Sequence, residues 1–340
     1  MKRIAILCDG TWNRPDQVHD GVACPTNVVR LHRALPSTAA DGVTQLPFYE
    51  RGVGTGRFDR LSGGMFGFGL SRNVRACHAF LTDHYDPGDE LYLFGFSRGA
   101  FTARSLGGLI GNSGIVRPEH RNRLDEAYKI YQDRGDPTKK PSGVTATAFR
   151  KAYAYSDVTP IRFIGVFDTV GALGIPLRIA ALTKRWSFHD VRLGAHVATA
   201  VQALAIDERR GPFLPTLWQR QLQAPPTQQL HQVWFSGVHS DVGGGYPDHR
   251  LGDLALRWMS HHANEAGLDV QPSAQPDALA PQHESYRSFY RLTKPRPRKL
   301  VGTEGGAASD SSWRRMRELP GYHPDNLRAY LATDPPHADA

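Results

Sequence analysis

The segment GFSRG (95–99) restricts the fold of this chain more than any other. It joins an apolar run, ELYLFGF (90–96), to RGAFTARSLGGLI (98–110), whose apolar residues recur at helical spacing, so we expect a strand, a sharp turn and a helix. Ser97 would have a strained backbone at such a turn, and the flanking glycines avoid collisions two positions to either side. The segment therefore has the form of a nucleophile elbow, which exposes a reactive serine at the N-terminus of a helix.

The rest of the chain alternates apolar strand-length runs with helical patterns. We expect strands at 3–8, 44–50, 90–96, 160–168 and 228–237, and helices at 26–35, 71–85, 98–110, 195–210 and 251–267, with inserted helices at 121–134 and 145–156. This order predicts an α/β fold resembling an α/β-hydrolase, a mostly parallel sheet with helices on both faces.

The domain organisation is predicted to be simple. No boundary is sharp enough to divide the 340 residues, so we expect a single domain, with a core over about 1–270. The glycine-rich stretch 52–69 is predicted to be a loop, and the proline-, glycine- and serine-rich stretch 271–340 an irregular tail.

The apolar runs exclude a membrane-spanning helix. The longest, such as FIGVF (163–167), are far below the roughly 20 residues that a spanning helix needs. The basic start MKRIAILCDGTWN lacks a long apolar region and a cleavage site, so no signal peptide is expected. Three cysteines without metal or CxxC spacing indicate a reducing compartment. We expect a cytoplasmic protein, with export by a dedicated secretion system left open.

The net charge of +8 and the pI of about 9.5 favour anionic partners. The densest basic run is TKPRPRK (293–299), in a proline-rich segment. No nucleic-acid-binding motif accompanies it, so nucleic acid is not expected as a partner. A solvated basic surface is the simplest interpretation, and peripheral contact with an anionic membrane is the alternative. The sequence does not indicate an oligomeric state.

A serine nucleophile needs a base and an orienting acid, which follow it in the order Asp, His in this fold. Asp168 directly follows the predicted strand IRFIGVF, and His239 follows the strand HQVWF in the loop SGVHSDVGGGY. Each also has a structural interpretation, because a strand-end aspartate often caps a helix and a loop histidine can serve packing. Asp241 competes for the acid role or braces the glycine turn.

The oxyanion formed during attack on an ester needs two N–H donors. The residue after the nucleophile, Arg98, supplies one, and the turn after the first strand is a candidate for the other, through Gly10 or Thr11. Alternatively, Asp9 only holds that turn in shape.

A metal site is the competing enzyme hypothesis. Asp9, Asp168 and Asp241 are expected at strand ends near His239, which would suit a hard metal ion in a metal-assisted phosphoesterase. That hypothesis leaves the elbow at Ser97 unexplained, whereas a serine triad needs no cofactor. The loop GVGTG (52–56) is weak evidence for phosphate binding, because it lacks the GKS/T of a P-loop.

Several segments together resemble one known family. They are CDGTWN (8–13), GVGTG, GFSRGAFTAR (95–104), GVFDTVGALG (165–174), ALAIDERRGPF (203–213) and FSGVHSDVGGGY (235–246). They are similar to the α/β-hydrolase-type domain first catalogued as of unknown function and since linked to the first class of type VI secretion lipase effectors. The resemblance runs from residue 3 to about 260. It implies an esterase or phospholipase with Ser97, His239 and Asp168 as its triad.

The chain departs from this family near its end. Such domains often carry a late His-x-Ser motif, whereas the similar stretch here, SDSSWRRM (309–316), has no histidine. His283 and His323 are therefore alternatives for the base. The large extra domain of membrane-targeted effectors has no counterpart, so the resemblance leaves a standalone esterase open beside a phospholipase. A non-catalytic interaction module is the alternative outside the enzymes.

Overall fold

The computed structural model describes residues 1–10, 13–52, 65–133, 135–170, 192–300, 306–333 and 337–338. Its centre is an eight-stranded sheet in which every described pairing is parallel, and this confirms the predicted α/β fold class. In spatial order the strands are β12 (His337–Ala338), β11 (Gly306–Ser309), β10 (Gln229–Phe235), β8 (Val197–Ala205), β6 (Ile161–Phe167), β5 (Glu90–Phe96), β1 (Arg3–Cys8) and β4 (Gln45–Glu50).

The strand order reverses beside β1. From β1 the chain passes to β4 on one side and then to β5 on the other, after which each new strand is added beyond β5. Cys8 pairs with Gly95 in register, so β1 and β5 end at the same edge. In open parallel sheets the crevice at the carboxyl ends of such a switch point is the usual ligand site. The topology therefore favours this edge for function.

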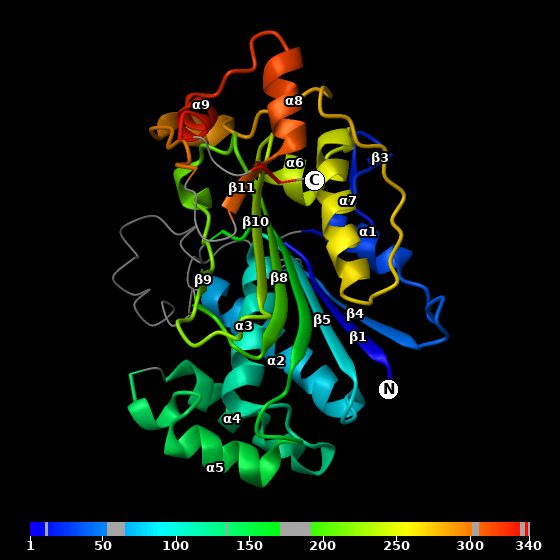
Figure 1. Cartoon of the computed structure of the whole chain (residues 1–340), viewed down its shortest axis with the longest axis vertical. Helices are drawn as coiled ribbons and strands as arrows, with labels where there is room; N and C mark the ends of the chain where they lie inside the picture. Colours follow the sequence, from blue (N-terminus) through cyan, green and yellow to red (C-terminus); the bar gives the residue numbers. More distant parts are fainter. Residues whose placement is uncertain are drawn as a thin grey trace.

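Helices cover both faces of the sheet (Figure 1). The alternating side chains of β1 divide between two cores, Ala5 and Leu7 in one, Ile4 and Ile6 in the other. On the first face lie α1 (Asn27–Ala34) and α7 (Arg250–Glu265); on the second lie α2 (Met65–His84) and α3 (Arg98–Ser113), with α4 (Leu124–Gln132) and α5 (Val144–Tyr153) packed outside them. No helix in these described ranges is long and apolar enough to cross a membrane.

The remaining elements are short. Over the part of the chain that the structure describes, they are β2 (Val18–His19), β3 (Val22–Ala23), β7 (Arg192–Leu193), β9 (Gln219–Arg220), α6 (His239–Gly243), α8 (Asp310–Glu318), α9 (Asp325–Leu331) and 3-10 turns at Pro118–Arg123, Pro137–Lys139, Gly211–Phe213 and Ser288–Leu292.

The helix predicted at 195–210 is wrong, because residues 197–205 form the inner strand β8. Its sequence, VATAVQALA, is rich in alanine, which favours helices. A strand buried on both faces loses the alternation that identifies a half-buried strand, since both sets of side chains are apolar. Val201 and Ala203 pack in one core, and Val197 and Ala200 in the other.

Two loop predictions also need correction. Most of the glycine-rich stretch 52–69 lies outside the described residues, but α2 already begins at Met65. The tail after 270 is not irregular throughout, because it adds β11, β12, α8 and α9. Figure 1 shows α8 and α9 together at one end of the molecule. β11 is only GAAS, four small residues whose pairing with β10 depends on the sheet and not on a local signal.

Candidate active site

Ser97 lies between the end of β5 and the start of α3, in the backbone conformation of a strained elbow. Its φ of 56° and ψ of −119° are rare for a residue with a side chain. A Cβ on Gly95 would lie 2.5 Å from Cα of Ala100, and a Cβ on Gly99 would collide with the carbonyl oxygen of Cys8. Both glycines are thus required by close packing of the elbow against β1 and α3. The N-terminus of α3 is adjacent to the serine.

Asp168 and His239 form a buried pair at the same edge of the sheet. Asp168 directly follows β6 and has a φ of 40°, while His239 follows β10 as the first residue of α6. Nδ1 of His239 lies 2.5 Å from Oδ2 of Asp168. The imidazole contacts two rings, with centroid distances of 4.7 Å to Phe96 and 5.0 Å to Phe213. Since Phe96 precedes Ser97, the pair sits beside the elbow.

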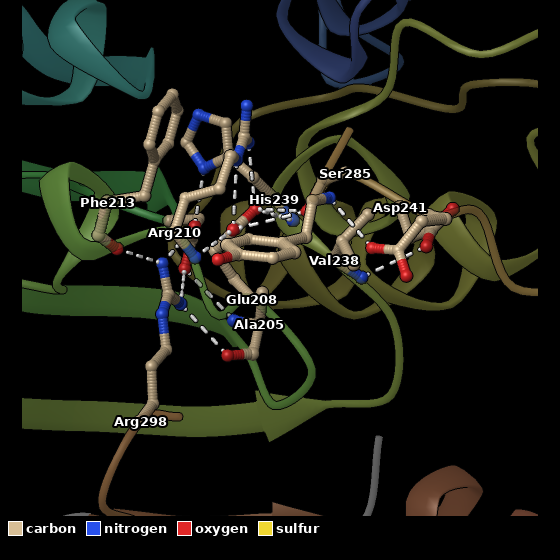
Figure 2. A network of polar contacts seen from close by, with 12 residues as sticks. Ala205, Glu208, Arg210, Phe213, Val238, His239, Asp241, Ser285 and Arg298 are labelled. Atoms are coloured by element: carbon tan, nitrogen blue, oxygen red, sulfur yellow. Dashed lines mark hydrogen bonds and ion pairs between the residues drawn. The ribbon is translucent and has the colours of Figure 1, made fainter. Parts of the chain in front are cut away.

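A buried guanidinium from the C-terminal segment holds Asp168; Figure 2 shows this residue, Arg298, beside Ala205 and Phe213. Arg298 donates from Nη1 to Oδ1 at 2.5 Å and from Nη2 to Oδ2 at 2.9 Å, and also to the carbonyls of Ala205 and Phe213. The N–H of Ala205 donates to the same carboxylate at 3.0 Å. Burial alone would raise the pKa of Asp168, but the charge of Arg298 and the hydrogen bond to His239 lower it well below its ordinary value.

Glu208 supports His239 from another direction (Figure 2). Its carboxylate accepts the N–H of His239 at 3.3 Å and the hydroxyl of Ser285 at 3.0 Å. Arg210 donates to it from Nε at 2.9 Å and from Nη2 at 2.8 Å. Burial opposes ionisation, but the bonds and charge of Arg210 prevail and lower the pKa of Glu208. Arg210 also covers the Phe213 ring, 3.5 Å from its centroid.

The electrostatics suit His239 to proton transfer. Burial lowers the pKa of His239, and the hydrogen bond that Nδ1–H donates to Asp168 opposes this only in part. A neutral imidazole whose Nδ1–H is held by an ionised carboxylate presents a basic Nε2. Within the described chain, Ser97 and His239 do not hydrogen-bond to each other. Catalytic hydrogen bonds of this type often form only when substrate binds.

The candidate oxyanion donors differ in their position and in whether their N–H groups are already bonded. Arg98 is the first residue of α3, next to Ser97. A Cβ on Gly10 would lie 3.4 Å from that of Ser97, so Gly10 is close to the nucleophile, but its N–H is donated to Oδ1 of Asp9 at 2.6 Å. Thr11 lies outside the described residues. Of the two candidates that the structure describes, Arg98 is the one at the N-terminus of α3, directly after the nucleophile.

Comparison with known proteins identifies the chain. Residues 2–262 match the family described as T6SS, phospholipase effector Tle1-like, catalytic domain. The chain belongs to this family. It is also similar to an uncharacterized protein of Saccharomyces cerevisiae, with 30% identity over 465 aligned residues covering 93% of this chain and 66% of the yeast protein. A crystal structure of an uncharacterized protein from Pseudomonas aeruginosa matches with 18% identity and a TM-score of 0.48, over 80% of this chain and 46% of that chain.

The chain thus spans just under two thirds of the yeast relative and less than half of the solved chain. The family description names a phospholipase effector. Arg298, at the site, lies beyond the matched residues 2–262.

The alternative acid and base of this Tle1-like domain pair with each other. Nδ1 of His283 lies 2.6 Å from Oδ1 of Asp241, and the ring of Tyr246 stacks on His283 at 3.8 Å. Asp241 also accepts the N–H groups of Val238 and His283. His323 is exposed between α8 and α9 and is not hydrogen-bonded to any described residue. The structure therefore brings Asp168 to His239 and to neither alternative.

The strand-end aspartates do not converge on a metal site. Asp9 accepts hydrogen bonds from Thr26 at 2.9 Å and Tyr49 at 2.6 Å, and burial raises its pKa. Asp168 and Asp241 are bound to different histidines. Among the described residues, no three His, Cys, Asp or Glu side chains are grouped as ligands for one ion. The aspartate placement expected by the metal hypothesis is therefore not found.

Sequence reasoning missed Glu208 and Arg298. Glu208 lies in the segment ALAIDERRGPF, which carried part of the family resemblance, but an acidic residue among charged neighbours gave no local indication of a role. Arg298 lies in the basic run 293–299, where a buried arginine is indistinguishable by sequence from its exposed neighbours.

Proposed function

We propose that this protein is a serine hydrolase that cleaves acyl esters, phospholipids among them, through Ser97, His239 and Asp168. The observation that carries the proposal is the buried Asp168–His239 pair beside a strained serine elbow. The topology supports it, because all three residues follow strands that end at one edge of a parallel sheet. The family description supports the lipid substrate.

In the proposed reaction, Nε2 of His239 accepts the proton of Ser97 Oγ as that oxygen attacks the ester carbonyl carbon. Asp168 stabilises the imidazolium that forms, and the N–H groups at the start of α3, Arg98 first, stabilise the oxyanion. The C–O bond to the alcohol then breaks, and the alcohol leaves with the proton from His239. Water, deprotonated by His239, attacks the acyl-enzyme. The C–O bond to Ser97 then breaks, His239 returns the proton to Ser97 Oγ, and the fatty acid is released.

The first experiment compares Ser97→Ala with the wild type, using a water-soluble ester and a fluorophosphonate probe. Loss of a triad nucleophile lowers turnover by about a thousandfold or more. We expect Ser97→Ala to lose both turnover and labelling while its circular dichroism spectrum is unchanged. A folded alanine variant that keeps more than about a tenth of wild-type turnover would contradict the proposal.

The base is tested by a matched pair of variants, His239→Gln and His283→Gln. Each histidine is bound through Nδ1 to an aspartate, so the two substitutions make the same chemical change in similar surroundings. We expect His239→Gln to lower kcat by at least about a hundredfold, and His283→Gln by less than about tenfold. The reverse order would assign the base to His283 and leave the serine mechanism in place.

A further inference from the structure

The segment 287–299, RSFYRLTKPRPRK, is here named the basic strap. It has six cationic residues and no acidic one, and the cation of Arg298 is buried on Asp168. The other five are exposed and form no ion pair with any described residue: Arg287, Arg291, Lys294, Arg296 and Lys299. By contrast, the nearby Arg209 is paired with Glu284. A cluster of unneutralised cations is costly to maintain and indicates an anionic partner.

The strap is fixed beside the candidate base. Arg298 attaches it to Asp168, and the N–H of Arg296 donates to the carbonyl of Arg209 at 2.8 Å. Within the strap, the Tyr290 ring lies 6.1 Å from the ring of Phe213, which contacts His239. The exposed charges are thus held close to the site where an ester would react.

Two exposed leucines lie close in sequence to the contact between Tyr290 and Phe213. Leu292 of the strap is 84% exposed, and Leu214, which follows Phe213, is 43% exposed. Exposure of apolar side chains to water is unfavourable. The headgroup region of a bilayer, in contrast, accepts leucine and attracts lysine and arginine. The same leucines would gain nothing from the phosphate backbone of a nucleic acid.

We infer that the basic strap is the surface on which this protein docks to an anionic phospholipid bilayer, with Leu292 and Leu214 entering the headgroup region. Docking would bring His239 and Ser97 to the lipid esters. The purpose of docking rests on the proposed hydrolase function, but the binding itself does not depend on catalysis.

The experiment uses the full chain with Ser97→Ala, so that vesicles are not hydrolysed. Flotation measures its partition onto phosphatidylcholine vesicles with and without phosphatidylglycerol. The strap variant carries Arg291→Gln, Lys294→Gln and Arg296→Gln. The control variant carries Lys129→Gln, Lys140→Gln and Lys151→Gln, three exposed lysines of the α4 and α5 region that also have no described ion pair. Both sets lower the net charge from +8 to +5.

We expect partition onto phosphatidylglycerol vesicles to fall about a hundredfold in the strap variant, since each lysine or arginine near an anionic surface contributes about fivefold. The control variant should bind nearly as the parent does, and added salt should weaken binding of the parent. When the three strap substitutions are made in the protein that retains Ser97, turnover of a water-soluble ester should be unchanged. Leu292→Ser alone should lower vesicle binding several-fold.

Three results would overturn the inference. The first is equal binding to vesicles with and without phosphatidylglycerol. The second is an equal loss in the strap and control variants, which would assign the effect to net charge alone. The third is displacement from vesicles by a short duplex DNA that binds more tightly, which would identify a nucleic-acid surface. If the wild type fails to cleave any ester, the proposed function fails, while vesicle binding by Ser97→Ala is judged separately.

Discussion

Arg298→Met removes the buried guanidinium that binds Asp168 and keeps most of the side-chain volume. The side chains of Arg298 and Asp168 are 1% and 0% exposed. The carboxylate of Asp168 would therefore lose both hydrogen bonds from the guanidinium, and water could not replace them. Removing one partner of a buried ion pair costs about 3–5 kcal/mol. We expect the free energy of unfolding to fall by this amount near neutral pH, a large part of the stability of an ordinary domain.

The pH dependence of this loss has a defined sign. In the wild type the pKa of Asp168 is lower than in the unfolded chain, so its contribution to stability is present at neutral pH and is lost only as the pH falls through the folded pKa. Without Arg298, burial is opposed only by the hydrogen bonds from His239 and Ala205, and the folded pKa rises. If the pKa of a carboxyl is higher in the folded protein than in the unfolded chain, the free energy of unfolding falls as the pH increases towards the folded pKa. The substitution should therefore be more damaging at about pH 8 than at about pH 5, by roughly 1.4 kcal/mol for each unit of pKa above 5.

The same charge acts on the base. Arg298 binds the carboxylate that accepts the hydrogen bond of His239, and a positive charge so placed disfavours protonation of the imidazole, so we expect removal of Arg298 to raise the pKa of His239. Because the base must be neutral to accept a proton, the acid limb of kcat/KM should move to higher pH. Arg298→Lys keeps a positive charge but not the paired hydrogen bonds. Compared with Arg298→Met, it should bring the acid limb of kcat/KM most of the way back to its wild-type pH, and should recover less of the free energy of unfolding.

The measurements are urea unfolding at the two pH values and the pH profile of kcat/KM for a water-soluble ester. Arg209→Met is the matched control, since Arg209 is 45% exposed and its ion pair with Glu284 should contribute less than about 1 kcal/mol. If the unfolding penalty of Arg298→Met is the same at both pH values and the acid limb does not move, the guanidinium does not set the charge state of the pair, and this reasoning is refuted.

Two further predictions concern the packing of the elbow and the need for a metal ion. Gly99→Ala should lower the free energy of unfolding by at least about 2 kcal/mol, because its Cβ would overlap the backbone of β1, whereas Gly135→Ala, whose Cβ meets nothing closer than 3.8 Å, should leave thermal unfolding nearly unchanged. Exhaustive chelation should leave ester turnover intact, since the proposed triad needs no metal; loss of turnover that a divalent ion restores, in protein that stays folded, would favour metal-assisted chemistry.

The parts of this molecule that sequence could predict depend on local signals. The elbow at Ser97 combines a strand, two glycines and a helix within about 20 residues, and each part restricts the others. The end of the strand before Asp168 is equally local, because the buried run of β6 stops at this polar residue. His239 follows the end of β10 at Phe235 by four positions, so the strand end places it only approximately. The edge of a parallel sheet then brings together residues that the sequence places 71 positions apart.

The parts that sequence could not predict depend on partners far along the chain. Arg298 is 130 positions from Asp168, and it lies in a run of exposed cations with the same composition. The strand β11 is recognisable from its pairing with β10 and β12 and not from its sequence, since GAAS has no strand preference of its own. Helix propensity misled the prediction for β8, where burial on both faces outweighs the preference of alanine.

The same limit applies to the choice between two Asp–His pairs, and our proposal of Asp168 and His239 rests on their surroundings. Asp241 accepts the N–H of Val238 at the start of α6 and the N–H of His283. Its carboxylate therefore links the backbone at His283 to the N-terminus of α6. The imidazole of His283 is stacked on Tyr246, which fixes it as part of that junction. Asp168 instead is held by the guanidinium of Arg298 on both oxygens and by the N–H of Ala205 on Oδ1, and its Oδ2 also accepts the hydrogen bond from Nδ1 of His239. His239 packs on Phe96, the residue before Ser97, so it is the imidazole that a substrate at the elbow would meet first.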